Sequence, residues 1–76
     1  MTLFGFAQAL RSFARRRPFL AYRIEFTSGA LIRVSHPEAV RMRGSVVIHV
    51  APTGKQRLFD FTSVCQFLDE EDLTIP

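Results

Sequence analysis

The sequence predicts an α+β fold in which an N-terminal helix precedes a small, strongly bent, five-stranded antiparallel sheet or barrel. Apolar residues recur at three- and four-residue steps in residues 1–17 and then alternate with polar residues in short runs separated by turn residues. The chain has 76 residues, of which 47% are hydrophobic and eight are Phe, which suits one hydrophobic core and leaves no room for a second. We therefore expect a single domain over residues 1–76, with an amphipathic helix at 1–17, a β-barrel at 20–68 and an acidic tail at 69–76.

Residues 1–17 have the pattern of an amphipathic helix. Its apolar positions are Leu3, Phe6, Leu10 and Phe13. Thr2 can cap the helix, and Pro18 should end it at about Arg16 or Arg17, because the residue before a proline is pushed out of the helical region. We expect this helix to pack over one end of the sheet, although a basic helix lying on a membrane or on nucleic acid would have the same pattern.

Residues 22–35 predict a β-hairpin, around which the rest of the chain should be arranged. Tyr22, Ile24 and Phe26 share one face of the first arm, and Ala30, Ile32 and Val34 share one face of the second. Ser28 and Gly29 lie between the arms, where a tight turn requires the positive φ that glycine adopts without steric cost.

The remaining chain predicts three more short strands, at residues 45–50, 56–61 and 65–68. Before them, Pro37 should begin a short helical turn capped by Ser35 or His36, and residues 39–43 should form a turn or irregular link. Apolar residues occupy both faces of residues 45–50, so both faces should be at least partly covered. Short sequential strands favour a meander that curls on itself, and its free edges invite pairing between copies.

The charge is divided unevenly along the chain. Residues 1–57 carry all ten Lys and Arg against two acidic residues, whereas residues 58–76 carry five acidic residues and no basic ones. A basic body with an acidic tail suits an anionic partner, and it equally suits a head-to-tail contact between neighbouring copies.

Several features bear on the location of the protein. Its one cysteine, Cys65, cannot form an intrachain disulfide, which favours a reducing compartment, and we expect a cytoplasmic protein. Cys65 lies in an apolar run, which predicts a small buried hydrophobe, with a reactive thiol as the alternative. No apolar run is long enough to cross a bilayer, and the arginines follow the first apolar segment rather than precede it, unlike a secretory signal. The acid-free, Arg-rich start is also typical of a mitochondrial transit peptide.

His36 and Glu38 are the only close pair of titratable groups outside the tail, so they are the place to look for acid–base chemistry. We expect a structural role instead, in which His36 caps or packs the turn and Glu38 lies in its first turn. His36, His49 and Cys65 do not have the spacing of a zinc site, although a site shared between subunits stays open. With no nucleophile or phosphate-loop motif, we predict no enzyme, no catalytic residue and no cofactor.

Basic residues interleaved with aromatic ones give the strongest functional hint. The candidate contacts to an anion or a nucleic acid are Arg15, Arg16, Arg17, Arg41, Arg43, Lys55 and Arg57. Phe19 or Tyr22 would stack on a base if exposed. The alternative is a solvated basic face, since Arg23 and Arg33 are expected opposite one another on the outer side of the hairpin.

The order of a helix and five short strands resembles the Sm-like fold, which includes the bacterial RNA chaperone Hfq. Ser28-Gly29 lies where that family has an Asn-Gly turn, whereas Val34 stands where it has a bending glycine. His36-Pro37-Glu38 replaces its Asp-containing loop. The resemblance implies a bent sheet that closes into rings, and it assigns no RNA-contacting residue in this chain.

A second resemblance is to a group of short, uncharacterised bacterial proteins. It rests on Arg17-Pro18-Phe19, Tyr22, Ile24, Ser28-Gly29, Val34, His36-Pro37-Glu38, Gly44, Asp60 and Val64. Ser28 and Ala21 replace an Asp and a frequent Pro of that group. Because the group has no established function, the resemblance implies an outline of the fold and no activity.

Two functions are therefore expected from the sequence. The first is a non-enzymatic, self-assembling or protein-interaction β-barrel module that forms homo-oligomers. The alternative is RNA binding by the basic surface of an Sm-like oligomer. A role at a membrane surface is a third, weaker possibility.

Overall fold

The computed structural model describes residues 1–70, in which one helix is followed by six strands. The elements are α1 (Leu3–Ala14), β1 (Tyr22–Phe26), β2 (Leu31–Val34), β3 (Val40–Arg43), β4 (Val46–Val50), β5 (Gln56–Asp60), the 3-10 helix η1 (Phe61–Ser63) and β6 (Val64–Asp69). They form two three-stranded antiparallel sheets: sheet A has the order β2-β1-β6 and sheet B has the order β3-β4-β5. The predicted α+β class is confirmed, with six strands rather than five.

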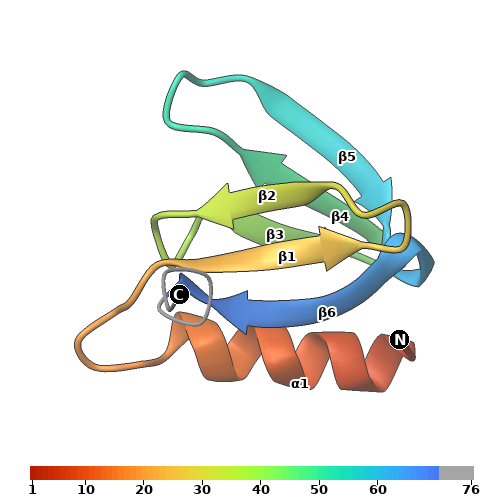
Figure 1. Cartoon of the computed structure of the whole chain (residues 1–76), viewed down its shortest axis with the longest axis horizontal. Helices are drawn as coiled ribbons and strands as arrows, with labels where there is room; N and C mark the ends of the chain where they lie inside the picture. The colour runs from red at the N-terminus through yellow and green to blue at the C-terminus, as the bar shows by residue number, and fades with distance from the viewer. Residues whose placement is uncertain (71–76) are drawn as a thin grey trace.

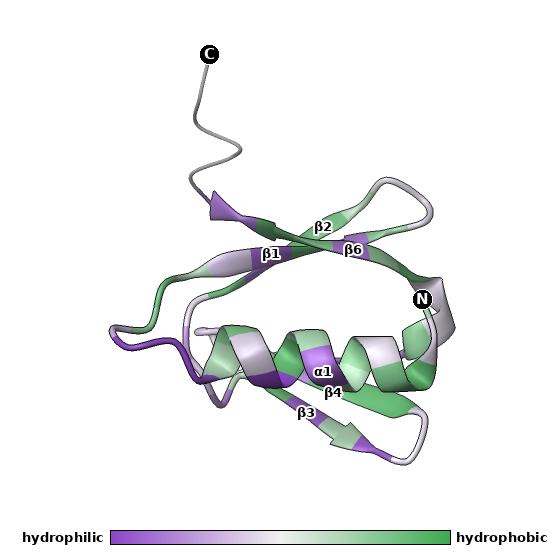
Figure 2. Ribbon diagram, turned by 90° about the horizontal axis from the view of Figure 1, so that it is seen from below, coloured by the Kyte–Doolittle hydropathy of each residue, from purple (hydrophilic) through white to green (hydrophobic). Residues whose placement is uncertain are grey.

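The two sheets face one another, and the helix lies along one open side between them (Figure 1). Seen from below, α1 runs between sheet A and sheet B and leaves β6 in view (Figure 2). No strand pairing joins the two sheets within residues 1–70, so they form an open pair of layers instead of a closed barrel. Strands β5 and β6 lie at opposite sides of this pair (Figure 1).

The additional strand is β3, in the stretch that was expected to be an irregular link. Val40 is buried, whereas Arg41 and Arg43 are exposed. This alternation is typical of an edge strand with one solvent-exposed face. Gly44 has φ 60° and allows a tight turn that pairs Arg43 with Val46. The predicted helical turn at Pro37 does not form a helix, and residues 36–39 make a hydrogen-bonded turn instead.

The predicted hairpin is confirmed as β1 and β2. Tyr22 pairs with Val34 and Arg23 with Arg33, as the alternating pattern requires. The amide of Phe26 donates to the carbonyl of Ala30 at 2.8 Å, so the connection is the three residues 27–29 rather than two. Gly29 has φ 92°, a conformation in which a side chain would be strained.

The helix begins as predicted and ends earlier. The amide of Gly5 donates to Oγ1 of Thr2 at 2.9 Å, so Thr2 is the N-cap. The last helical residue is Ala14, and Arg15 is the C-cap. Arg16 and Arg17 therefore belong to the link that leads to β1, not to the helix.

The core is built from one face of each strand together with the inner face of α1. Its fully buried large side chains are Tyr22, Phe6, Ile24, Val34, Val47 and Val64. Two rings from the helix pack on Phe67 of β6: the centroid of Phe6 lies 5.5 Å from that of Phe67, and the centroid of Phe13 lies 5.4 Å from it. Phe26 meets Phe59 edge to face at 4.8 Å and joins sheet A to sheet B. Aromatic contacts thus bind all three layers together.

Two expectations for the C-terminal part are wrong. Cys65 is exposed rather than buried, because a β-bulge opposite Glu25 and Phe26 leaves Cys65 without a partner in the pairing of β1 with β6. The acidic tail does not begin at residue 69, since Asp69 ends β6 and Glu70 is bonded to Arg33. Residues 71–76 of the predicted tail lie outside the described residues.

Candidate functional site

Arg16, one of the predicted anion contacts, is engaged within the chain. Its Nη1 forms an ion pair with Oδ1 of Asp69, and its Nη2 donates to the carbonyl of Leu20 at 2.9 Å. Its guanidinium also lies 4.5 Å from the centre of the Phe13 ring. These contacts tie the link after α1 to the end of β6 and withdraw Arg16 from an external anion.

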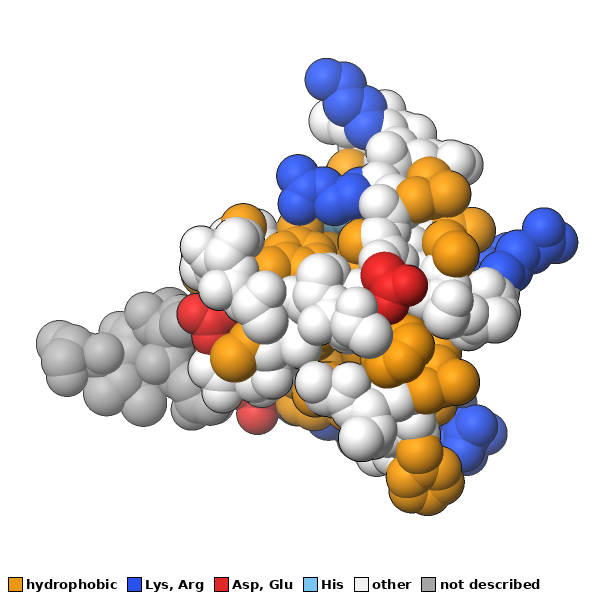
Figure 3. Space-filling view, turned by 90° about the vertical axis from the view of Figure 1, so that its right-hand side faces the viewer, with side chains coloured by type: hydrophobic (Ala, Val, Ile, Leu, Met, Phe, Trp, Pro, Cys, Tyr) orange, Lys and Arg blue, Asp and Glu red, His pale blue; other side chains and the backbone are white. Residues whose placement is uncertain are grey.

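The other six predicted contacts are exposed, and they fall in three separate parts of the chain. Arg15 is the C-cap of α1 and Arg17 lies in the link after it, Arg41 and Arg43 are on β3, and Lys55 and Arg57 lie at the start of β5. None of the six forms an ion pair within residues 1–70. At one end of the molecule, basic side chains project at separate points with hydrophobic side chains between them (Figure 3).

The strand register separates two of these groups further. Arg41 and Arg43 alternate with buried Val40, so they point away from the core on the outer face of sheet B. Arg57 pairs with His49, which is buried, and therefore lies on the opposite face. Arg41 and Arg43, two residues apart on β3, therefore share the outer face of sheet B.

The aromatic residues proposed to stack on a base are not available for it. Tyr22 has no exposed surface, and it packs between Phe13, Phe19 and Phe67. Phe19 is half-buried, and its ring centroid lies 6.2 Å from that of Tyr22. Both side chains belong to the aromatic core beside α1.

His36 has the structural role that its position predicts. Its Nδ1 accepts a hydrogen bond from the backbone amide of Glu38 at 3.1 Å, and the amide of Ala39 donates to the carbonyl of His36 at 3.0 Å. The ring therefore caps the turn between β2 and β3. Its bond to Glu38 runs to the backbone, so the pair does not form the carboxylate–imidazole contact that orients a general base.

His49 is the one titratable side chain of sheet B that the fold places in the interior, with 7% of its surface exposed. Burial lowers the pKa of His49, opposed by a hydrogen bond to the backbone of Arg33, and the positive charge of Arg57 lowers it further. Its Nε2 has no hydrogen-bond partner in the part of the chain that the structure describes. His49 therefore stays neutral at neutral pH.

An open groove of about 810 Å³ lies on the outer face of sheet B, which sequence analysis did not find. Residues that line it include Ala39, Arg41, Arg43, Ile48, Val50 and Gln56. The outward face of β4 was expected to be at least partly covered; Val46 and Val50 on it are 39% and 38% exposed, and Ile48 is half-buried. The signal was present as alternating valine and isoleucine, but the sequence does not show whether another layer covers that face.

Four strands lie at sheet edges within residues 1–70: β2 and β6 in sheet A, and β3 and β5 in sheet B. Strand β5 pairs only with β4, and β6 pairs only with β1, within residues 1–70. Leu58, in the middle of β5, is 62% exposed, and every other residue of that strand except Phe59 is exposed. An edge strand with an exposed leucine is a template for pairing with another strand.

Residues 1–70 contain neither a cluster that could hold a metal ion nor a helix that could span a membrane. No three His, Cys, Asp or Glu side chains there lie close enough to hold a metal ion, which leaves open a site shared between copies. The only α-helix described, α1, is too short and insufficiently apolar to span a bilayer. No family model matches the chain, and no curated protein or solved structure matches it either.

Proposed function

We propose that this protein is a non-enzymatic module that assembles with copies of itself, by pairing the free edge of β5 in one copy with the free edge of β6 in the next. The observation that carries the proposal is the exposure of Leu58 on an unpaired edge strand. A small core without a disulfide or metal within the described residues gains stability when such an edge is covered.

The placement of the two edges supports a head-to-tail arrangement. Strands β5 and β6 lie at opposite sides of the molecule and run in opposite directions (Figure 1). Stacking one copy on the next thus brings β5 beside an antiparallel β6. Contacts between two different surfaces of this kind produce a ring when the rotation closes and a filament when it does not.

The charges at the two edges also support it. Lys55 and Arg57 lie at the start of β5, and β6 ends in Asp69 and is followed by Glu70; these two carboxylates are already paired with Arg16 and Arg33 within the chain. Antiparallel pairing would place these ends side by side, with Glu71 and Asp72 next in sequence. The basic start of β5 in one copy would then lie beside the acidic residues that follow β6 in the next copy.

We also propose that the fold is Sm-like and that the protein is cytoplasmic. A helix followed by short antiparallel strands around one core, with a single turn of 3-10 helix before the last strand, supports the former. The exposed, unpaired Cys65 supports a reducing compartment.

The assembly is tested by the mass of the full chain in solution. Light scattering should give a mass of several chains, and Leu58→Asp should lower it to one chain because the new charge would lie beside the side chains of the added strand. Leu31→Asp is the matched control, since Leu31 is 42% exposed on β2, an edge strand that the proposed pairing does not use, and this variant should keep the larger mass. A mass of one chain for the native protein at high concentration would refute the proposal.

Nucleic-acid binding is the second candidate, and the arginine pair on β3 is the observation that favours it. Arg41 and Arg43 are exposed on one face and carry no ion pair within residues 1–70. If they contact phosphates, Arg41→Ala with Arg43→Ala should weaken binding to a random RNA pool and reduce its dependence on salt. Arg16→Ala should change binding less, because Arg16 is paired with Asp69. Binding that ignores salt would count against this candidate.

A further inference from the structure

The groove on the outer face of sheet B has an apolar floor and a basic rim. Its floor includes Ala39, Ile48 and Val50, and its rim carries Arg41 and Arg43 against the single carboxylate of Glu38. No element among residues 1–70 covers the exposed valines of β4. A ligand for this groove should therefore be extended, partly apolar and negatively charged.

We infer that the occupant is the segment of residues 71–76 from a neighbouring copy of the chain. This segment begins with Glu71 and Asp72 and continues with Leu73, Thr74, Ile75 and Pro76. In an extended chain alternate side chains share a side, so Leu73 and Ile75 would face the apolar floor together. The two carboxylates match the excess positive charge of the rim.

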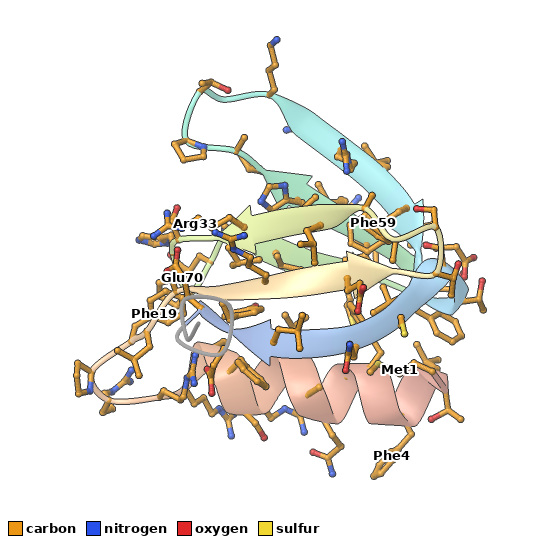
Figure 4. All side chains as sticks on the ribbon, in the orientation of Figure 1. Met1, Phe4, Phe19, Arg33, Phe59 and Glu70 are labelled. Carbon is orange, nitrogen blue, oxygen red and sulfur yellow. The ribbon has the colours of Figure 1, made fainter. Side chains whose placement is uncertain are left out.

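The occupant comes from a neighbour because the segment of the same chain cannot bring its charges to the rim. Glu70 is held on the outer side of sheet A, where Arg33 bonds to it at 2.7 Å (Figure 4). The Cα atom of Glu71 lies only about 3.8 Å further along the chain. Arg41 and Arg43 point outward from sheet B, on the far side of two layers that pack about 10 Å apart.

Strand addition delivers a neighbour's segment to the correct place, and the inference rests on that proposed assembly. In an antiparallel pair, the end of the neighbour's β6 lies beside Gln56, the first residue of β5. Gln56 itself lines the groove. Six extended residues span about 20 Å, which is enough to cross from Gln56 over Val50 toward Ile48.

Cross-linking between two single-cysteine chains tests the inference. Both chains carry Cys65→Ser; one adds Val50→Cys in the groove and the other adds Thr74→Cys in the segment. A short bismaleimide should join them with a yield about tenfold above that of a control chain with Thr27→Cys, an exposed position in the β1–β2 turn. A yield equal to that control would overturn the inference.

Reversing the charges on both sides tests the proposed ion pairs between the rim of the groove and the segment. Arg41→Glu with Arg43→Glu in the groove chain should lower the yield about fivefold at low salt, and Glu71→Arg with Asp72→Arg in the partner should restore it. Circular dichroism checks that each variant is folded. An unchanged yield after the reversal would overturn the inference, as would intramolecular cross-linking in a dilute chain that carries both cysteines.

The mass of each sample separates this inference from the assembly. If the native chain has a mass of several copies but the groove does not cross-link to the segment, assembly stands and the occupant is wrong. If the chain has a mass of one copy and Leu58→Asp changes nothing, strand addition fails and the inference fails with it.

Discussion

Arg33 and Glu70 form a two-point ion pair across sheet A. Nε of Arg33 donates to Oε1 of Glu70 at 2.7 Å, and Nη2 donates to Oε2 at 3.2 Å (Figure 4). Arg23 of β1 lies between them, with its Nη2 3.8 Å from the same Oε1. One carboxylate after β6 therefore lies within ion-pair distance of both arginines that face one another on the hairpin.

This contact predicts that Glu70 contributes to acid sensitivity. The hydrogen bond from Arg33 lowers the pKa of Glu70 from its usual 4.5, so Glu70 stabilises the fold above that pH and loses this contribution as pH falls below it. Glu70→Gln should therefore reduce the loss of stability between neutral and acidic pH, measured by urea unfolding. Glu38→Gln is the control, and an equal change in both variants would contradict the prediction.

Tyr22→Phe should stabilise the protein. The hydroxyl of Tyr22 is buried without a hydrogen-bond partner among residues 1–70, and burial raises the pKa of Tyr22 to about 12. Removing an unpaired buried hydroxyl while keeping the ring should raise the free energy of unfolding by about 1 kcal/mol. Tyr22→Leu should lower it by about 2 kcal/mol or more, because the ring contacts are lost. A less stable Tyr22→Phe variant would show that the hydroxyl is hydrogen-bonded.

His49 should make the fold less stable in mild acid. Burial lowers the pKa of His49 from its usual 6.5, so the unfolded chain binds a proton more readily than the folded one. The contribution of neutral His49 to the free energy of unfolding is fully present above pH 6.5, and it decreases as the pH falls below that value. Denaturant unfolding at neutral pH and at about one unit below 6.5 should show the loss in the native chain and not in His49→Gln. The same loss in both would assign it to another group.

Phe59→Ala should separate the role of the inter-sheet contact from general loss of apolar surface. Phe59 is half-buried and meets Phe26 edge to face, so its truncation should cost about 2 to 3 kcal/mol in thermal or urea unfolding. Phe4 points away from the body of the protein and is 74% exposed (Figure 4). Phe4→Ala should change the monomer's stability by less than about 0.5 kcal/mol, and similar costs for the two variants would contradict the prediction.

Local patterns were enough to predict the elements whose sequence signal is strong. Thr2 and the spacing of apolar residues predicted α1, and alternation about Gly29 predicted the hairpin with Arg23 opposite Arg33. The strand β3 was missed although its residues alternate between apolar and basic, because a run of four residues is too short to distinguish a strand from a link. Cys65 was placed in the core because a bulge changes which side chains point inward without leaving a mark in the sequence.

The candidate site was less predictable than the fold. The sequence grouped seven cations by charge alone. The structure pairs Arg16 with Asp69 and distributes the others over the end of α1 and the link after it, β3, and the start of β5. The groove on sheet B and the free edge at Leu58 were not predicted, because the sequence does not specify which hydrophobic faces lack a neighbour.

Local residue patterns are sufficient to specify the helix, the first hairpin, the positions of the turns and the uneven charge along the chain. These depend on neighbouring residues, through backbone preferences and the repeat distance of helix and strand. The tertiary structure decided that β1 pairs with β6, that Tyr22 and His49 are enclosed, and that one face of β4 is left open. Those outcomes depend on which distant segments pack together, and that is fixed by the shape and volume of the whole core.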